Sequence, residues 1–195
     1  MRYLALGDSF TIGTGTTPDR SFPAVLVGLW GAAGHEWDLR NPAVNGYTTD
    51  DLIRDELPLV EAYQPDLVTV LIGANDIVAG RRDDRYRAQL RRIHERIHAG
   101  APGAARYALP QPDWSLAPAG ASFGDPVRVA RTIERFNQVA RDEAERAGAT
   151  YIDLFPLMRE QMRKGMAAPD GLHPAAEAYA EWAAALVDEL RILRA

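Results

Sequence analysis

One serine, one histidine and one aspartate combine the residue types that acyl transfer requires. A serine hydroxyl attacks a carbonyl when a base takes its proton, and an imidazole serves as that base when an acid orients it. Asp170 stands three residues before His173, so its carboxylate can reach the second imidazole nitrogen. Ser9 follows Gly7 and Asp8, where a short apolar run ends. We therefore predict a nucleophile at Ser9, a base at His173 and an orienting acid at Asp170.

Acyl transfer also needs hydrogen-bond donors for the oxygen that becomes negative in the transition state. Three donors are predicted: the backbone N–H groups of Ser9 and Gly46 and the side-chain amide of Asn75. Gly46 and Asn75 stand in segments of small and polar residues, 44–47 and 73–76.

The elements that must position these residues are predicted to alternate between strands and helices. Such an alternation indicates a three-layer α/β/α sandwich around a five-stranded parallel sheet. The predicted strands cover residues 3–6, 36–43, 66–72, 105–109 and 150–154. Helices are predicted over residues 22–30, 49–63, 84–99, 127–147 and 175–193. A length of 195 residues suits one domain, which we expect to span residues 1–195.

The candidate residues come directly after the predicted strands. Ser9 follows the first strand, Gly46 the second and Asn75 the third. Asp170 and His173 follow the fifth strand after a further helix. Ligands bind beyond the carboxyl ends of the strands in an open parallel sheet, so these residues are expected to meet at one edge.

The four blocks around these residues resemble, in the same order, the blocks of the SGNH hydrolases, also called GDSL esterases and lipases. Here they read Gly7-Asp8-Ser9-Phe10, a block centred on Gly46, Gly73 to Asp76, and Asp170 to His173. The resemblance spans nearly the whole chain. It implies a flavodoxin-like fold with sheet order 2-1-3-4-5 and hydrolysis of carboxylic esters, or related acyl bonds, through an acyl-enzyme on Ser9. Phe10 stands where the family usually has leucine, and we expect it to pack behind the serine.

Simpler interpretations of the same residues stay open. Gly-Asp-Ser at 7–9 and Asp-Gly at 170–171 are also turn-forming sequences, and Asp8 and Asp76 are interpreted as structural groups that fix their loops. The same fold can also serve as a non-catalytic binding module for a small molecule. No Gly-x-Ser-x-Gly surrounds Ser9, which argues against an α/β-hydrolase elbow.

His94-Glu95-Arg96-Ile97-His98 matches H-E-x-x-H, which on a helix can place two imidazoles on one zinc ion of a metallopeptidase. We interpret the match as a coincidence, because the predicted helix ends almost at once at Gly100 and no third ligand is evident nearby. We therefore expect no metal and no cofactor, and a small-molecule acyl ester as the substrate.

One long segment between the predicted strand 105–109 and the predicted helix 127–147 is 111–126, which is rich in proline, glycine and alanine. It is either a surface excursion or a functional loop. Trp114 and Phe123 within it would suit an apolar acyl or aromatic group if the loop folds over the site. Nothing in the sequence chooses among short-chain esters, acylated sugars, lysophospholipids, thioesters and peptides.

Composition excludes several other classes. A formal net charge of -5 offers nucleic acid no electrostatic reason to bind, and the absence of cysteine excludes thiol catalysis and disulfides. The apolar run at the N-terminus is too short for a signal peptide, and no run reaches membrane-spanning length. We expect a cytoplasmic location, with a processed secreted form and the oligomeric state left open.

Overall fold

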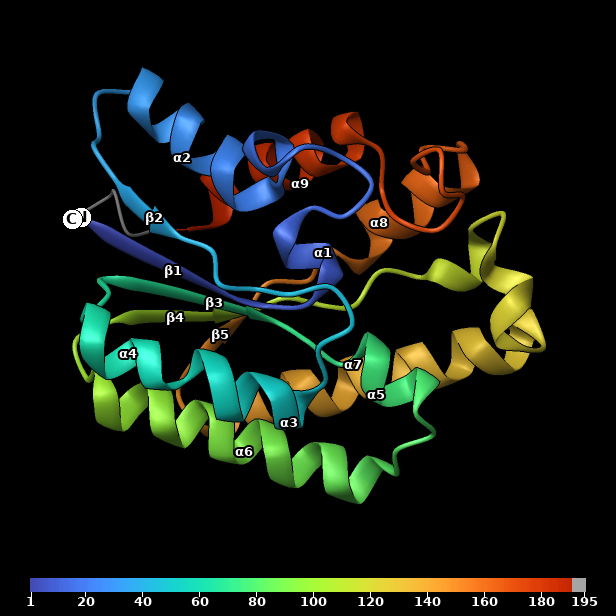
Figure 1. The fold of residues 1–195 in the computed structure, drawn as a ribbon, viewed down its shortest axis with the longest axis horizontal. Helices are drawn as coiled ribbons and strands as arrows, with labels where there is room; N and C mark the ends of the chain where they lie inside the picture. The colour runs from blue at the N-terminus through green and yellow to red at the C-terminus, as the bar shows by residue number, and fades with distance from the viewer. Residues whose placement is uncertain (191–195) are drawn as a thin grey trace.

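The two central strands, β1 (Arg2–Gly7) and β3 (Leu67–Leu71), are apolar runs buried along almost their whole length. They belong to a five-stranded sheet in the order β2-β1-β3-β4-β5, in which all neighbours are parallel. The computed structural model describes residues 1–190 and confirms the predicted sheet order (Figure 1). The other strands are β2 (Asp38–Arg40), β4 (Ala105–Ala108) and β5 (Thr150–Tyr151).

Alternate residues of β1 face opposite sides of the sheet, and helices cover each side (Figure 1). Tyr3 and Ala5 belong to one apolar core, and Leu4 and Leu6 belong to the other. The predicted three-layer α/β/α sandwich is therefore confirmed. The covering helices are α2 (Phe22–Ala32), α8 (Phe155–Arg163) and α9 (Ala176–Glu189) on the first side, and α4 (Pro58–Tyr63), α6 (Asp83–Gly100) and most of α7 (Pro126–Arg146) on the second.

The edge strands are shorter than predicted. β2 covers part of the predicted 36–43, and β5 covers the start of 150–154. Each pairs with a single neighbour, and Pro42 has no N–H to extend the ladder of β2. The end of the last predicted helix, 191–193, lies outside the described residues.

Residues 49–63 form three helical segments instead of the single helix predicted. They are α3 (Thr49–Asp51), the π-helical η2 (Leu52–Glu56) and α4 (Pro58–Tyr63). Pro58 has no N–H and therefore breaks the α-helical ladder, while the Leu57 N–H donates to Leu52 O, five residues earlier, at 3.0 Å. In this wider turn the Glu56 side chain is buried, with 1% exposure.

Gly7, the last residue of β1, has no room for a side chain. A Cβ atom at this position would lie 2.2 Å from Leu71 O and 2.2 Å from Thr11 Oγ1. Leu71 is also the residue paired with Gly7 across the sheet. A side chain here would separate β1 from β3 at the point where Ser9 begins the next element.

We expect Gly7→Ala to lower the Tm, because overpacking of this kind typically costs about 1–3 kcal/mol. Gly28→Ala is the control: it lies in α2, a Cβ there meets no atom within 4 Å, and it should stabilise the helix by about 0.5–1 kcal/mol. Scanning calorimetry of both variants measures the difference. A Gly7→Ala variant as stable as the wild type would contradict the close approach.

Candidate active site

The segments that follow the strands meet around one pocket at the carboxyl end of the sheet. Its volume is about 90 Å³, and it brings together Ser9, Asn75 and His173 from distant parts of the sequence. The structure thus gathers three of the predicted site residues in one place. The other lining residues are Phe10, Asn45, Ala74, Val78, Trp114, Phe123 and Leu172.

Asp170 and His173 form a hydrogen-bonded pair, with 2.7 Å between Oδ2 and Nδ1. Asp170 Oδ1 also accepts from the backbone N–H groups of Leu172 and His173, at 2.9 and 3.0 Å. Burial raises the pKa of Asp170, but hydrogen bonds from Leu172 and His173 outweigh it and hold the pKa below its usual range. Because an ionised carboxylate can only accept, Nδ1 is the donor in this bond, so Nε2 is the ring nitrogen left to take up a proton.

Ser9 is the first residue of the short helix α1 (Ser9–Ile12) and is 5% exposed. The Asp8 carboxylate caps this helix by accepting from the Phe10 N–H at 3.1 Å. Within residues 1–190 the Ser9 hydroxyl has no hydrogen-bond partner, so it is free to meet a ligand in the pocket that it shares with His173.

Phe10 does more than pack behind the serine. Its ring centroid lies 5.3 Å from that of His173 and 6.3 Å from that of Trp114, and it also lines the pocket. The sequence predicted packing behind the serine, and the structure adds contacts with His173 and Trp114 and a place in the pocket wall. The Phe10 ring therefore packs against the His173 imidazole within the pocket wall.

The Asn75 amide is held by one hydrogen bond. Asn75 lies in α5 (Ala74–Val78), and its Nδ2 donates to Tyr47 O at 2.9 Å. One amide hydrogen is thereby used, and the second is left for the pocket that Asn75 lines. Gly46 has a φ of 90°, which favours glycine, but it is exposed and does not line the pocket, whereas its neighbour Asn45 does.

Asp76, in α5, connects this helix to the first residue of α3. It is fully buried and accepts from the Thr49 N–H at 2.9 Å and from the Thr49 hydroxyl at 2.7 Å. The Arg81 guanidinium lies 3.0 Å from the same carboxylate. With the cap formed by Asp8, these contacts confirm that Asp8 and Asp76 are structural groups.

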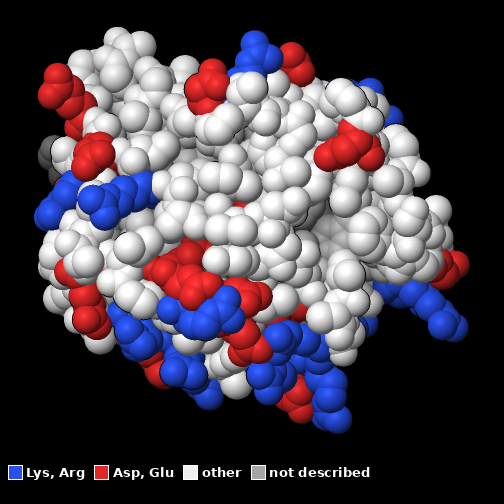
Figure 2. Space-filling model, viewed as in Figure 1, with Lys and Arg blue, Asp and Glu red and all other residues white. Residues whose placement is uncertain are grey.

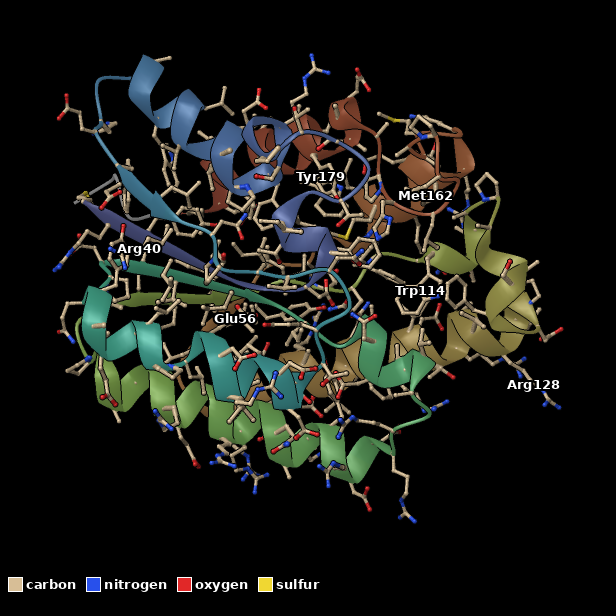
Figure 3. All side chains as sticks on the ribbon, viewed as in Figure 1. Arg40, Glu56, Trp114, Arg128, Met162 and Tyr179 are labelled. Atoms are coloured by element: carbon tan, nitrogen blue, oxygen red, sulfur yellow. The ribbon has the colours of Figure 1, made fainter. Side chains whose placement is uncertain are left out.

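The segment 111–126 folds over the pocket, as the functional interpretation of this loop predicts. It contains two short helical turns, η3 (Trp114–Leu116) and η4 (Gly120–Phe123), and both Trp114 and Phe123 line the pocket. Figure 2 shows a hollow bordered by uncharged residues at the place where Figure 3 shows Trp114. The loop therefore supplies an apolar wall.

Buried contacts anchor this loop at two points. The fully buried Asp113 carboxylate accepts from the Ser115 hydroxyl at 2.5 Å and pairs with Arg159 of α8 at 3.2 Å. Further along, the Ala119 N–H donates to Gly171 O at 2.8 Å. The second contact connects the loop to the segment that carries Asp170 and His173.

The two histidines of the H-E-x-x-H match lie in different surroundings. His94 is 1% exposed, and burial lowers its pKa to about 4, whereas His98 is exposed near the end of α6. Among the described residues no group of three His, Cys, Asp or Glu side chains could hold a metal ion. His94 is thus a buried core residue of α6.

Four pocket residues were not predicted: Asn45, Ala74, Val78 and Leu172. Asn45, Ala74 and Leu172 lie within the blocks that carry Gly46, Asn75 and His173. Their positions beside predicted site residues could have indicated that they line the pocket. Val78 carries no such signal, because only the packing of α5 brings it to the pocket.

Comparison with known proteins then identifies the family. The sequence model of the GDSL-like lipase/acylhydrolase family matches residues 5–181. The chain belongs to this family. Membership supports hydrolysis of ester bonds in general, whereas comparison with curated proteins gave no significant match.

Solved structures share the fold of this GDSL-like protein. TesA is 23% identical, with a TM-score of 0.78 and 98% of each chain covered. A lipase/acylhydrolase from Enterococcus faecalis is 23% identical, with a TM-score of 0.79 over 97% of this chain and 95% of that one. The acetylxylan esterase Axe2 from Geobacillus stearothermophilus is 22% identical, with a TM-score of 0.76 over 96% and 93%.

None of the helices in residues 1–190 of the GDSL-like protein combines the length and the apolar character needed to cross a membrane. The cytoplasmic location stays a prediction from the sequence.

Removing the cation that faces Asp113 should loosen the loop of the GDSL-like protein. We expect Arg159→Ala to lower the free energy of unfolding by about 2 kcal/mol, because it removes the cation from a buried carboxylate that keeps, among residues 1–190, only the Ser115 hydroxyl as a partner. Limited proteolysis should then cleave within 111–126 faster than in the wild type.

The matched control is Glu134→Gln, which removes the exposed second partner of Arg159 and should cost less than about 0.5 kcal/mol. Equal proteolysis rates in Arg159→Ala and Glu134→Gln would show that the Asp113 pair does not anchor the loop.

Proposed function

We propose that this GDSL-like protein is a serine hydrolase that cleaves carboxylic ester or related acyl bonds through an acyl-enzyme on Ser9. The observation that carries the proposal is the 2.7 Å bond from Asp170 to His173, in a pocket that also holds Ser9. We treat residues 1–195 as one hydrolase domain, since the family match spans residues 5–181.

The first step forms the bond between Ser9 Oγ and the carbonyl carbon, while the hydroxyl proton moves to His173 Nε2. The Asp170 carboxylate stabilises the imidazolium that results. The bond to the leaving alcohol then breaks, and His173 returns the proton to that oxygen. Water attacks the acyl-enzyme in the same manner, which releases the acid and restores Ser9.

The oxyanion is proposed to accept from the backbone N–H groups of Ser9 and Gly46 and from the Asn75 amide. The bond from Asn75 Nδ2 to Tyr47 O supports this role, because it fixes the plane of the amide before substrate arrives. The left-handed backbone of Gly46 lies between Asn45, which lines the pocket, and Tyr47.

The acyl group is proposed to be short and apolar. The pocket is small, with a volume of about 90 Å³, and its walls include Phe10, Val78 and Trp114. Val78, Trp114 and Phe123 also line a neighbouring cavity of about 270 Å³, so these three side chains border both spaces. We therefore expect an optimum between acetyl and butyryl esters in a p-nitrophenyl ester series.

Ser9→Ala is expected to abolish labelling by an organophosphonate and to lower kcat by about 10³ to 10⁶, because the nucleophile is lost. Mass spectrometry of the labelled protein locates the adduct. Ser122→Ala is the control, because Ser122 lines the neighbouring cavity and should leave labelling unchanged.

An adduct on any residue other than Ser9 would overturn the assignment. Tight ligand binding that survives Ser9→Ala, with no ester turnover in the wild type, would instead favour the non-catalytic binding module.

Asn75→Ala should lower kcat by about 10² to 10³, which is the usual cost of one oxyanion donor. The KM should change little, because the donor acts on charge that develops in the transition state. Steady-state kinetics of Asn45→Ala serve as the comparison, since Asn45 lines the same pocket without a proposed donor role. Equal losses in the two variants would argue against a special role for Asn75.

A further inference from the structure

Glu56 is a buried acid that lies next to the nucleophile turn. Its Oε2 accepts from the Gly7 N–H at 2.9 Å, two residues before Ser9. Within residues 1–190 its Oε1 is buried without a hydrogen-bond partner. Figure 3 shows Glu56 on the side of the sheet that α4 and α6 cover. A carboxyl in this position contacts the end of β1 but no solvent.

The elements packed against η2 bring like charge towards Glu56. The turn after β1 contributes Asp8, which is fully buried and whose Oδ2 also lacks a partner among the described residues. On η2 itself, Asp55 is paired with the exposed Arg54. No lysine, arginine or histidine of the described residues forms an ion pair with Glu56, so its negative charge would be uncompensated.

The other charged groups nearby do not alter this balance. Asp76 acts on Asp8 and is itself paired with Arg81. From α3, Asp51 is paired with Arg54, and from α4, Glu61 is exposed and 3.9 Å from Arg96. The Tyr86 hydroxyl of α6 donates to Ile72 O.

Burial raises the pKa of Glu56 to about 8, although the hydrogen bond from the Gly7 N–H acts in the opposite direction, and the charges of Asp8 and Asp55 add to the rise. Burial and the charge of Asp76 raise the pKa of Asp8 to about 7. A neutral carboxyl still accepts from the Gly7 N–H through its carbonyl oxygen. The ionised form would place an uncompensated charge at the Gly7 N–H, two residues before Ser9, whose own N–H is a proposed oxyanion donor.

We propose that Glu56 is a positioning residue that holds the turn from Gly7 to Ser9 in its active geometry while it is protonated, and that its ionisation switches turnover off. This inference rests on the proposed hydrolase function. Ionisation breaks the O–H bond of the carboxyl and releases the proton to solvent. It requires no further reactant.

The test compares kcat against pH for the wild type and Glu56→Gln, from about pH 5.5 to about pH 10. Glutamine keeps the size and the acceptor oxygen but cannot ionise. In the wild type, kcat should fall above about pH 8, approaching a tenfold loss per pH unit. In Glu56→Gln the loss centred near pH 8 should be absent, and only a loss due to Asp8, near pH 7, should remain. Superimposable profiles would overturn the proposal.

Glu56→Leu separates positioning from simple filling of space. Leucine cannot accept from the Gly7 N–H, so kcat should fall at every pH, whereas Glu56→Gln should keep wild-type kcat at neutral pH. A Glu56→Leu variant as active as Glu56→Gln, with the same Tm, would show that the Gly7 contact does not position Ser9.

A stability measurement distinguishes failure of this inference from failure of the hydrolase proposal. The folded pKa of Glu56 is raised from 4.5 to about 8, so the native state binds more protons than the unfolded state in this window. The free energy of unfolding should therefore fall as pH rises through it. Glu56→Gln should reduce the slope by roughly half, because Asp8 still titrates.

An unchanged slope in Glu56→Gln would overturn the inference whatever the kinetics show. The expected slopes without ester turnover in either protein would overturn the hydrolase proposal, and with it the role in turnover, while supporting the buried neutral acid.

Discussion

Parallel alignment of the strands is the constraint on which the site depends. Because all five strands run in one direction, the turn after β1, the segment after β2 and the start of α5 after β3 open at the same edge. Ser9, Asn45 and Asn75 meet there although long stretches of sequence separate them. His173 reaches the same edge from the segment after α8, and a hydrogen bond from the loop that follows β4 holds that segment.

Buried carboxyls hold the loops in place once the sheet has gathered them. Asp76 and Asp113 each face an arginine: Asp76 connects α5 to α3, and Asp113 connects the loop over the pocket to α8. Asp8 and Glu56 have no such cation and lie beside the nucleophile turn. Ion pairs of Asp76 and Asp113 therefore stabilise the walls of the site. The nucleophile turn instead contacts Asp8 and Glu56, two buried acids whose pKa values are raised to about 7 and about 8.

The sequence predicted the features that short stretches of neighbouring residues make recognisable. Sheet order followed from a resemblance between short blocks, and Asp170 contacts His173 across only three positions. Tertiary packing decided the rest. The burial of Glu56 follows from a π-helical turn ahead of Pro58, and a charged residue on a predicted amphipathic helix is ordinarily assigned to solvent.

The loop over the pocket, 111–126, is anchored by buried contacts in its first part, and its last part carries an exposed pocket residue. Its first half is fixed by Asp113, and Ala119 fastens its middle to Gly171, whereas Phe123 near its end is 39% exposed. Substitutions at that end can accumulate without disturbing the residues that hold the fold together. Substitution of Phe123 could therefore change which acyl groups the pocket accepts while the anchoring contacts stay the same. Substrate range can then evolve independently of the residues proposed to cleave the bond.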